Sequence, residues 1–74
     1  MKKILIVEDE FKLAMVMQKY LQNAGYATQH FAIGTGVIDW IKSNNPAAIL
    51  LDIQVPEVDG ITLCKEIRKF SDIP

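Results

Sequence analysis

The stretches ILIVED, residues 4–9, and AILLD, residues 48–52, each carry an apolar run directly into carboxylate side chains. An apolar run without alternation is typical of a central parallel strand, because both faces of such a strand are covered. Parallel strands all point the same way, so the acids that follow them would meet at one edge of the sheet. Ligands bind at this edge in open α/β sheets. The two stretches therefore predict an α/β fold with an acidic site formed by Glu8, Asp9 and Asp52.

The rest of the chain alternates between strand-like and helix-like segments. Strands are expected at residues 3–7, 26–31 and 47–51, and helices at residues 10–23, 36–43 and 61–70. Strands joined by helices of this length form a parallel sheet with right-handed crossovers. The strand at 26–31 is the most polar of the three, which favours an edge position. The order βαβαβα predicts an incomplete flavodoxin-like parallel sheet.

Apolar spacing predicts the buried face of the two longer helices. The first helix has an apolar stripe with a 3.6-residue period, formed by Leu13, Met17, Tyr20, Leu21 and Ala24. The third helix has a stripe formed by Leu63, Cys64, Ile67 and Phe70. We expect both stripes, Cys64 included, to face the core.

The composition is that of one small globular domain, with 50% of the 74 residues hydrophobic and 23% charged. A net charge of −1 offers no electrostatic case for nucleic-acid or membrane binding by this chain. The single cysteine, Cys64, excludes an internal disulfide and suits a reducing cytosol. The first apolar run stops at Glu8, too early for a secretory signal, so we expect a cytoplasmic domain.

Three carboxylates at one strand edge favour a hard cation. Like charges at close range raise one another's pKa unless something neutralises them. Mg²⁺ takes one or two carboxylates, keeps several waters and binds phosphate oxygens on its free side. An aspartate beside such a cation can act as a nucleophile and form an aspartyl-phosphate. The alternative is that the acids only cap helices, but capping does not require two acids in succession at Glu8 and Asp9.

Two motifs carry a resemblance to a known family. ILIVEDE at residues 4–10 is followed by LLDIQVPEVDG at residues 50–60, with a helix stop at Gly25 and Tyr26 between them. Together they resemble the receiver domain of bacterial two-component response regulators. The VEDE opening is most similar to the subgroup that carries a C-terminal winged-helix DNA-binding domain. The resemblance covers residues 1–74 and implies a partial receiver, with the first three of its five strands.

The resemblance implies a role for each acid. Asp52 would be the phosphoacceptor, Asp9 and Asp52 would bind Mg²⁺ directly, and Glu8 would act on the metal mainly through water. The backbone carbonyl of Gln54 would be a further ligand. The phosphoryl donor would be a phosphohistidine on a sensor histidine kinase. These roles describe a phosphoacceptor in transcription regulation, not an enzyme, with DNA contacted only through a C-terminal domain absent from this chain.

The chain departs from the family pattern in two ways. Gln54 stands where the family more often has Met or Leu, so we expect its side chain to alter the lifetime of the phosphorylated state. The switch Ser or Thr and the Lys of the family's later strands would lie beyond Pro74. We therefore expect the chain as given to have little phosphorylation-dependent output.

Two other classes of protein remain as alternatives. A metal-dependent phosphohydrolase of the haloacid-dehalogenase type also uses an Asp at a strand end, but it needs a second Asp two residues later as general acid. This chain has Gln54 there, and an amide cannot deliver the proton. A passive flavodoxin-like assembly module needs no acids at the strand ends.

The remaining expectations concern association and one histidine. The third strand would present an unpaired edge, so we expect either self-association of the chain or a poorly folded monomer. His30 lies on the polar strand and offers no ligand set, so we expect it to be an ordinary exposed side chain.

Overall fold

Three parallel strands form the centre of the structure, a computed structural model that describes residues 2–52 and 59–74. The strands are β1 (Lys3–Val7), β2 (Ala27–Phe31) and β3 (Ala48–Leu51), in the spatial order β2-β1-β3. Both pairings are parallel, with Val7 opposite Phe31 in β2 and opposite Leu51 in β3. This confirms the predicted parallel α/β fold and the edge position of β2.

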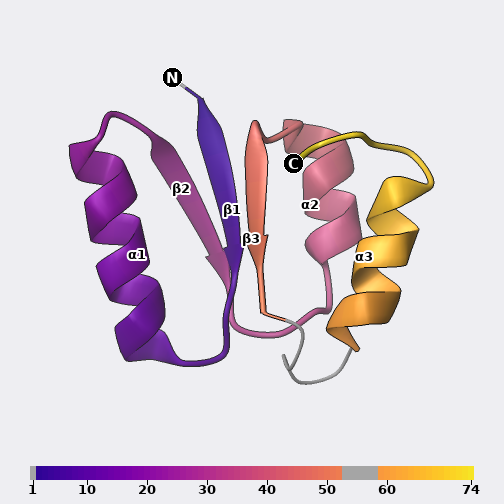
Figure 1. Ribbon diagram of the computed structural model, residues 1–74, viewed down its shortest axis with the longest axis horizontal. Coiled ribbons are helices and arrows are strands. Elements are labelled where there is room, and N and C mark those ends of the chain that lie inside the picture. Colours follow the sequence, from indigo (N-terminus) through magenta and orange to yellow (C-terminus); the bar gives the residue numbers. More distant parts are fainter. Residues whose placement is uncertain (1, 53–58) are drawn as a thin grey trace.

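Three helices cover the sheet. They are α1 (Phe11–Asn23), α2 (Val37–Asn44) and α3 (Gly60–Arg68). Figure 1 shows α1 on one side of the sheet and α2 and α3 on the other. Each helix lies within two residues of its predicted start and end, and the largest difference is α3, which ends at Arg68 and not at Phe70.

The core lies between β1 and the helices α2 and α3. Leu5 and Val7, whose side chains point to the same face of β1, are fully buried. They belong to one cluster with four buried helix residues, namely Val37, Ile41, Leu63 and Ile67. Trp40 and Phe31 pack against this cluster with their rings 6.3 Å apart in an edge-on arrangement.

Local backbone chemistry explains where the helices begin and end. Gly25, just beyond α1, and Gly36, just before α2, have φ values of 96° and 85°, a region that other residues adopt only with strain. The side chain of Asp59 caps α3 by accepting hydrogen bonds from the Ile61 N–H at 3.3 Å and from the Thr62 hydroxyl at 3.1 Å. Glu10 occupies the cap position of α1 without a side-chain hydrogen bond to the helix.

The prediction that the apolar stripe of α1 faces the core is wrong. Ala14 is the buried residue of this helix, whereas Leu13 is 43% exposed and Tyr20 is 75% exposed. The stripe on α3 is partly right, since Leu63 and Ile67 are buried but Cys64 and Phe70 are exposed. The reason is that α1 packs mainly against β2, and Leu13 and Met17 border an open groove beside Leu50 of β3.

Candidate functional site at the carboxyl edge of the sheet

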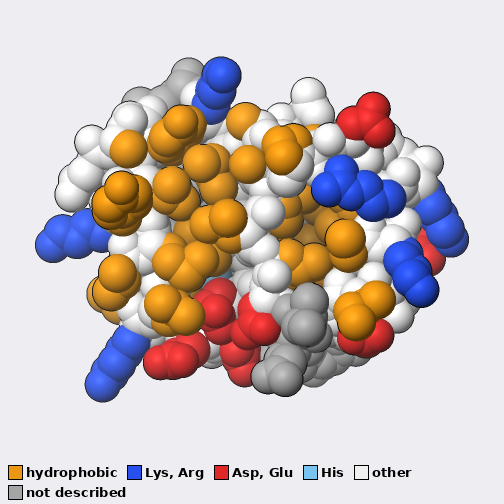
Figure 2. All heavy atoms as spheres, in the orientation of Figure 1, with side chains coloured by type: hydrophobic (Ala, Val, Ile, Leu, Met, Phe, Trp, Pro, Cys, Tyr) orange, Lys and Arg blue, Asp and Glu red, His pale blue; other side chains and the backbone are white. Residues whose placement is uncertain are grey.

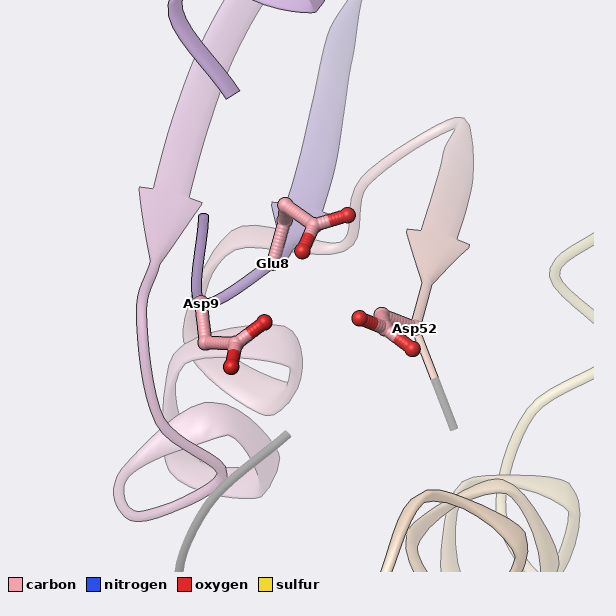
Figure 3. A group of neighbouring side chains, drawn as sticks. All are labelled: Glu8, Asp9 and Asp52. Atoms are coloured by element: carbon pink, nitrogen blue, oxygen red, sulfur yellow. The ribbon is translucent and has the colours of Figure 1, made fainter. Parts of the chain in front are cut away.

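The sheet brings Glu8, Asp9 and Asp52 together. Because Val7 is opposite Leu51, the residues that follow the two strands leave the sheet side by side. One carboxylate oxygen from each acid lies within 4.8 Å of the others. Figure 3 shows the three carboxylates turned toward the same space, two from the end of β1 and one from the end of β3. The predicted meeting of these acids is thus present in the structure.

Hydrogen bonds beyond the strands hold the acids in this position. The backbone N–H of Glu8 donates to the Phe31 carbonyl of β2 at 3.0 Å. The backbone N–H of Asp52 donates to the Val7 carbonyl of β1 at 3.0 Å. The parallel ladder therefore continues by one residue on each side of β1 and fixes the backbone from which Glu8 and Asp52 project.

The three acids differ in burial. Glu8 is only 8% exposed, Asp52 is half-buried and Asp9 is exposed. The backbone N–H of Glu10 donates a hydrogen bond to the Glu8 carboxylate at 3.2 Å, and this bond lowers the pKa of Glu8. Burial and the neighbouring carboxyl groups of Asp9 and Asp52 raise it by more in sum, so the pKa of Glu8 lies above its ordinary value. Such a cluster favours any cation that can neutralise it.

The donor set fits Mg²⁺. The ion bonds to oxygen at 2.0–2.1 Å, so two oxygens on one ion lie at most about 4.2 Å apart. The three carboxylate oxygens lie within 4.8 Å of one another, which is close to this limit. A small side-chain rotation or an intervening water closes the difference, and Mg²⁺ usually keeps several of its waters. Exposed Asp9 and half-buried Asp52 also leave room for water and for a phosphate on the solvent side.

A groove extends from the acids along the α1 side of the sheet. Its lining includes Leu13 and Met17 of α1, Leu50 of β3, and the acids Glu8 and Asp52. In Figure 2 acidic side chains gather below an apolar patch, so the site lies where a charged edge meets an apolar surface.

His30 is a residue of this site that the sequence interpretation missed. It is half-buried, not fully exposed, and its Nε2 lies 2.6 Å from the backbone carbonyl oxygen of Glu8. The ring of Phe11 meets the imidazole edge-on, with 5.6 Å between the ring centres. Its position in the chain could have indicated this role. His30 is the next-to-last residue of β2, and β2 pairs with β1 and ends at the same acidic edge.

The predicted ligand Gln54 lies outside the described residues, which exclude 53–58. Asp59 and Gly60, where the chain is described again, begin α3 on the opposite side of the sheet from α1.

The chain belongs to the response regulator receiver domain family, whose sequence model matches residues 4–74. The transcriptional regulatory protein BaeR of Escherichia coli is 49% identical over 72 residues, which are 97% of this chain and 30% of BaeR. The chain therefore spans less than a third of the length of this relative.

Solved receivers share the fold. The response regulator TrrA of Thermotoga maritima in complex with Mg²⁺-BeF superposes with a TM-score of 0.85 at 33% identity, over 93% of this chain and 60% of that one. TrrA in complex with the histidine kinase ThkA superposes with a TM-score of 0.87 at 32% identity, over 96% of this chain and 61% of that one. The flavodoxin-like fold class predicted from the sequence is thereby confirmed. Within the described residues, no helix has the length and apolarity that a membrane crossing requires.

Proposed function

We propose that Asp52 accepts a phosphoryl group from a phosphohistidine of a sensor kinase, with Mg²⁺ held by Asp9 and Asp52 and contacted by Glu8 through water. The observation that carries this proposal is the convergence of the three carboxylates within 4.8 Å at the ends of β1 and β3. Receiver domains as a class are signalling proteins and not classical enzymes, which favours a stoichiometric acceptor. When bound, the cation offsets the charge of the acids and of the incoming phosphoryl group.

The transfer needs one nucleophile from this chain. A carboxylate oxygen of Asp52 forms a bond to phosphorus while the bond between phosphorus and the donor imidazole nitrogen breaks, and the electron pair returns to the imidazole. Asp52 is half-buried at the end of β3, so it is partly accessible to a phosphoryl donor. Asp9 is more exposed and faces it across the site.

The kinase partner is supported by a relative. TrrA, which shares this fold at 32% identity, has been solved in complex with the histidine kinase ThkA.

The wider assignment follows the relatives. BaeR is named as a transcriptional regulatory protein, so we propose a transcription regulator that works in the cytoplasm and contacts DNA through a part other than residues 1–74. The assignment of residues 1–74 to one domain is supported by the buried cluster that joins β1, α2 and α3. Gln54 as a backbone ligand and as a modulator of the phosphorylated state's lifetime also belongs to this proposal.

Phosphorylation by a small phosphodonor tests the proposal. The chain is incubated with acetyl phosphate and Mg²⁺, and intact-mass spectrometry counts the phosphoryl groups added. We expect one labile adduct, lost in the variant Asp52→Asn and lost with EDTA. Asp59→Asn is the matched control, because Asn caps the start of α3 as well as Asp does. Equal labelling of wild type and Asp52→Asn would contradict the proposal.

A Mg²⁺ titration followed by NMR separates the acceptor from a passive flavodoxin-like module. Resonances near Asp9 and Asp52 shift on Mg²⁺ addition if the acids bind the cation, and those of the distant Lys3 and Asn44 pair stay unchanged. No shift near the acids would favour the passive module.

Self-association of the 74-residue chain is the last part of the proposal. Among the described strands, β3 pairs with β1 alone, and on its outer side the Ile49 N–H donates a hydrogen bond to the Pro74 carbonyl at 3.0 Å. Leu50, 40% exposed, lies in the groove beside this edge. Sedimentation velocity should show a dimer that Leu50→Lys weakens and Leu50→Met does not. A monomer at all concentrations would remove this part and leave the acceptor role intact.

A further inference from the structure

We propose that His30 is a positioning residue of the acidic site, which acts by fixing the backbone carbonyl of Glu8. The inference rests on the proposed function, because the acids that it positions are the proposed Mg²⁺ ligands. Its basis is a hydrogen bond from His30 Nε2 to the Glu8 carbonyl oxygen, 2.6 Å long, that crosses from β2 to the end of β1.

Strand β2 holds Glu8 at both of its peptide groups. The N–H of Glu8 donates to the Phe31 carbonyl at 3.0 Å, and the carbonyl of Glu8 accepts from the neighbouring His30 side chain. A residue fixed on both sides of its Cα has no free rotation about φ or ψ. The direction of the Glu8 Cα–Cβ bond is therefore set, and so is the start of the next peptide, which carries Asp9.

The hydrogen bond defines which nitrogen of the His30 imidazole carries a hydrogen. A carbonyl oxygen only accepts, so Nε2 must carry the hydrogen. Phe11 adds a second contact to the imidazole, because its ring meets it edge-on at an interplanar angle of 88°. Phe11 is the first residue of α1 and is 65% exposed, so its ring is placed against His30 more than against the core.

The turn needs such a restraint because of its own charge. Glu8, Asp9 and Glu10 are consecutive acids, and like charges at this spacing repel. The turn's own hydrogen bond, from the Glu10 N–H to the Glu8 carboxylate at 3.2 Å, occupies an oxygen of Glu8 and does not fix the carbonyl. The bond from His30 is the contact that ties this carbonyl to a strand.

A pair of amide variants tests the donor. In His30→Gln the amide nitrogen reaches nearly as far as Nε2, whereas in His30→Asn it stops near the position of Nδ1. We expect His30→Asn to weaken Mg²⁺ binding about tenfold, in the lower range for groups that orient metal ligands, and His30→Gln to recover most of the loss. Isothermal titration with MgCl2, at a temperature where every variant is folded by circular dichroism, gives the Kd values.

A second measurement concerns the metal-free chain. Imidazole ¹⁵N shifts report which nitrogen carries the hydrogen, and we expect the Nε2–H form for His30. Phe11→Leu should loosen this preference and leave the fold intact, because the Phe11 side chain is mostly exposed.

Several results would overturn the inference. These are an Nδ1–H form, equal Mg²⁺ affinities for wild type and His30→Asn, or equal losses for the Asn and Gln variants. Reduced stability with unchanged affinity would show a structural role only, which also contradicts it. If wild type itself binds no Mg²⁺, the proposed function fails, and the imidazole form then decides whether the His30 bond exists.

Discussion

The two faces of the sheet are built differently. On the side of α2 and α3, apolar side chains of β1 meet apolar side chains of both helices, and Leu5, Val37 and Leu63 are at most 2% exposed. On the side of α1, contact with the sheet is partly polar. Gln18 and Gln22 both donate to the hydroxyl of Thr28 in β2, at 3.2 Å and 2.9 Å. Apolar side chains of α1 such as Val16 remain 66% exposed.

The packed core and the groove that contains two of the acids lie on different faces of the sheet. The groove on the α1 side contains Glu8 and Asp52, so the proposed acceptor opens on the face with the thinner cover. The opposite face contains the cluster that holds the strands in register. The open groove and the packed cluster therefore lie on opposite faces of the sheet.

The largest expected effect comes from the same substitution made on each face. Leu63→Ala removes a side chain that is 2% exposed and should lower the free energy of unfolding by about 2–5 kcal/mol. A domain of this size has roughly 3–5 kcal/mol in total, so this variant should be largely unfolded. Leu13→Ala, at a position 43% exposed, should cost about 1 kcal/mol. Urea denaturation followed by circular dichroism measures both. Equal costs would mean that the faces do not differ.

A smaller effect should come from the polar contact of α1. Thr28→Val keeps the shape of the side chain and removes the oxygen that accepts from Gln18 and Gln22. We expect a loss of about 1 kcal/mol, because each hydrogen bond contributes only modestly and one glutamine is exposed. Thr35→Val, at an exposed loop position, is the control and should change the urea midpoint little. A neutral Thr28→Val would show that α1 docks without these bonds.

The pH dependence of stability tests the charge of the acidic edge. Because the pKa of Glu8 is raised in the folded protein, the folded state binds more protons than the unfolded chain between the two pKa values. The free energy of unfolding should therefore fall as the pH rises through that window. Glu8→Gln should remove this fall and make the metal-free protein more stable at neutral pH.

Thermal unfolding of wild type and Glu8→Gln in EDTA, at a series of acidic pH values, measures this pH dependence of stability. Glu66→Gln, whose exposed side chain pairs with Lys69 at 3.0 Å on the surface, is the control. A wild type whose stability rises with pH as steeply as that of Glu8→Gln would contradict the expectation.

The smallest effect should be at Cys64, next to the buried Leu63. Its spacing placed it on the buried stripe, but the thiol is exposed. Cys64→Ser should change the free energy of unfolding by less than about 0.5 kcal/mol. A cost above 1 kcal/mol in the same urea experiment would show that the thiol is packed in solution.

The parts of the fold that sequence predicts are those decided locally. Unbroken apolar runs identify β1 and β3, the polar composition of residues 27–31 identifies an edge strand, and glycines mark the ends of the intervening segments. The meeting of Glu8, Asp9 and Asp52 follows from strand direction alone, because parallel strands end at one edge.

The parts that sequence does not predict depend on neighbours distant in the chain. Periodicity says that Tyr20 and Phe70 are on apolar stripes, but not whether anything lies opposite them, and both are exposed. Phe70 instead lies under the ammonium group of Lys42, 5.0 Å from its ring centre. The sequence predicts an ordinary exposed His30 because a lone histidine offers no ligand set, and no pattern of side chains indicates its hydrogen bond to a backbone carbonyl.

The placement of Lys3 and Pro74 has a practical consequence. Strand β1 begins at Lys3, and Pro74 lies beside Ile49 near the beginning of β3, so Lys3 and Pro74 both lie at the side of the sheet away from the acids (Figure 1). A fluorophore, an affinity tag or a sensor-chip linker attached at either end is therefore remote from Asp52. Binding to an immobilised kinase domain can be recorded with the label in either place, and the two geometries should give the same association rate.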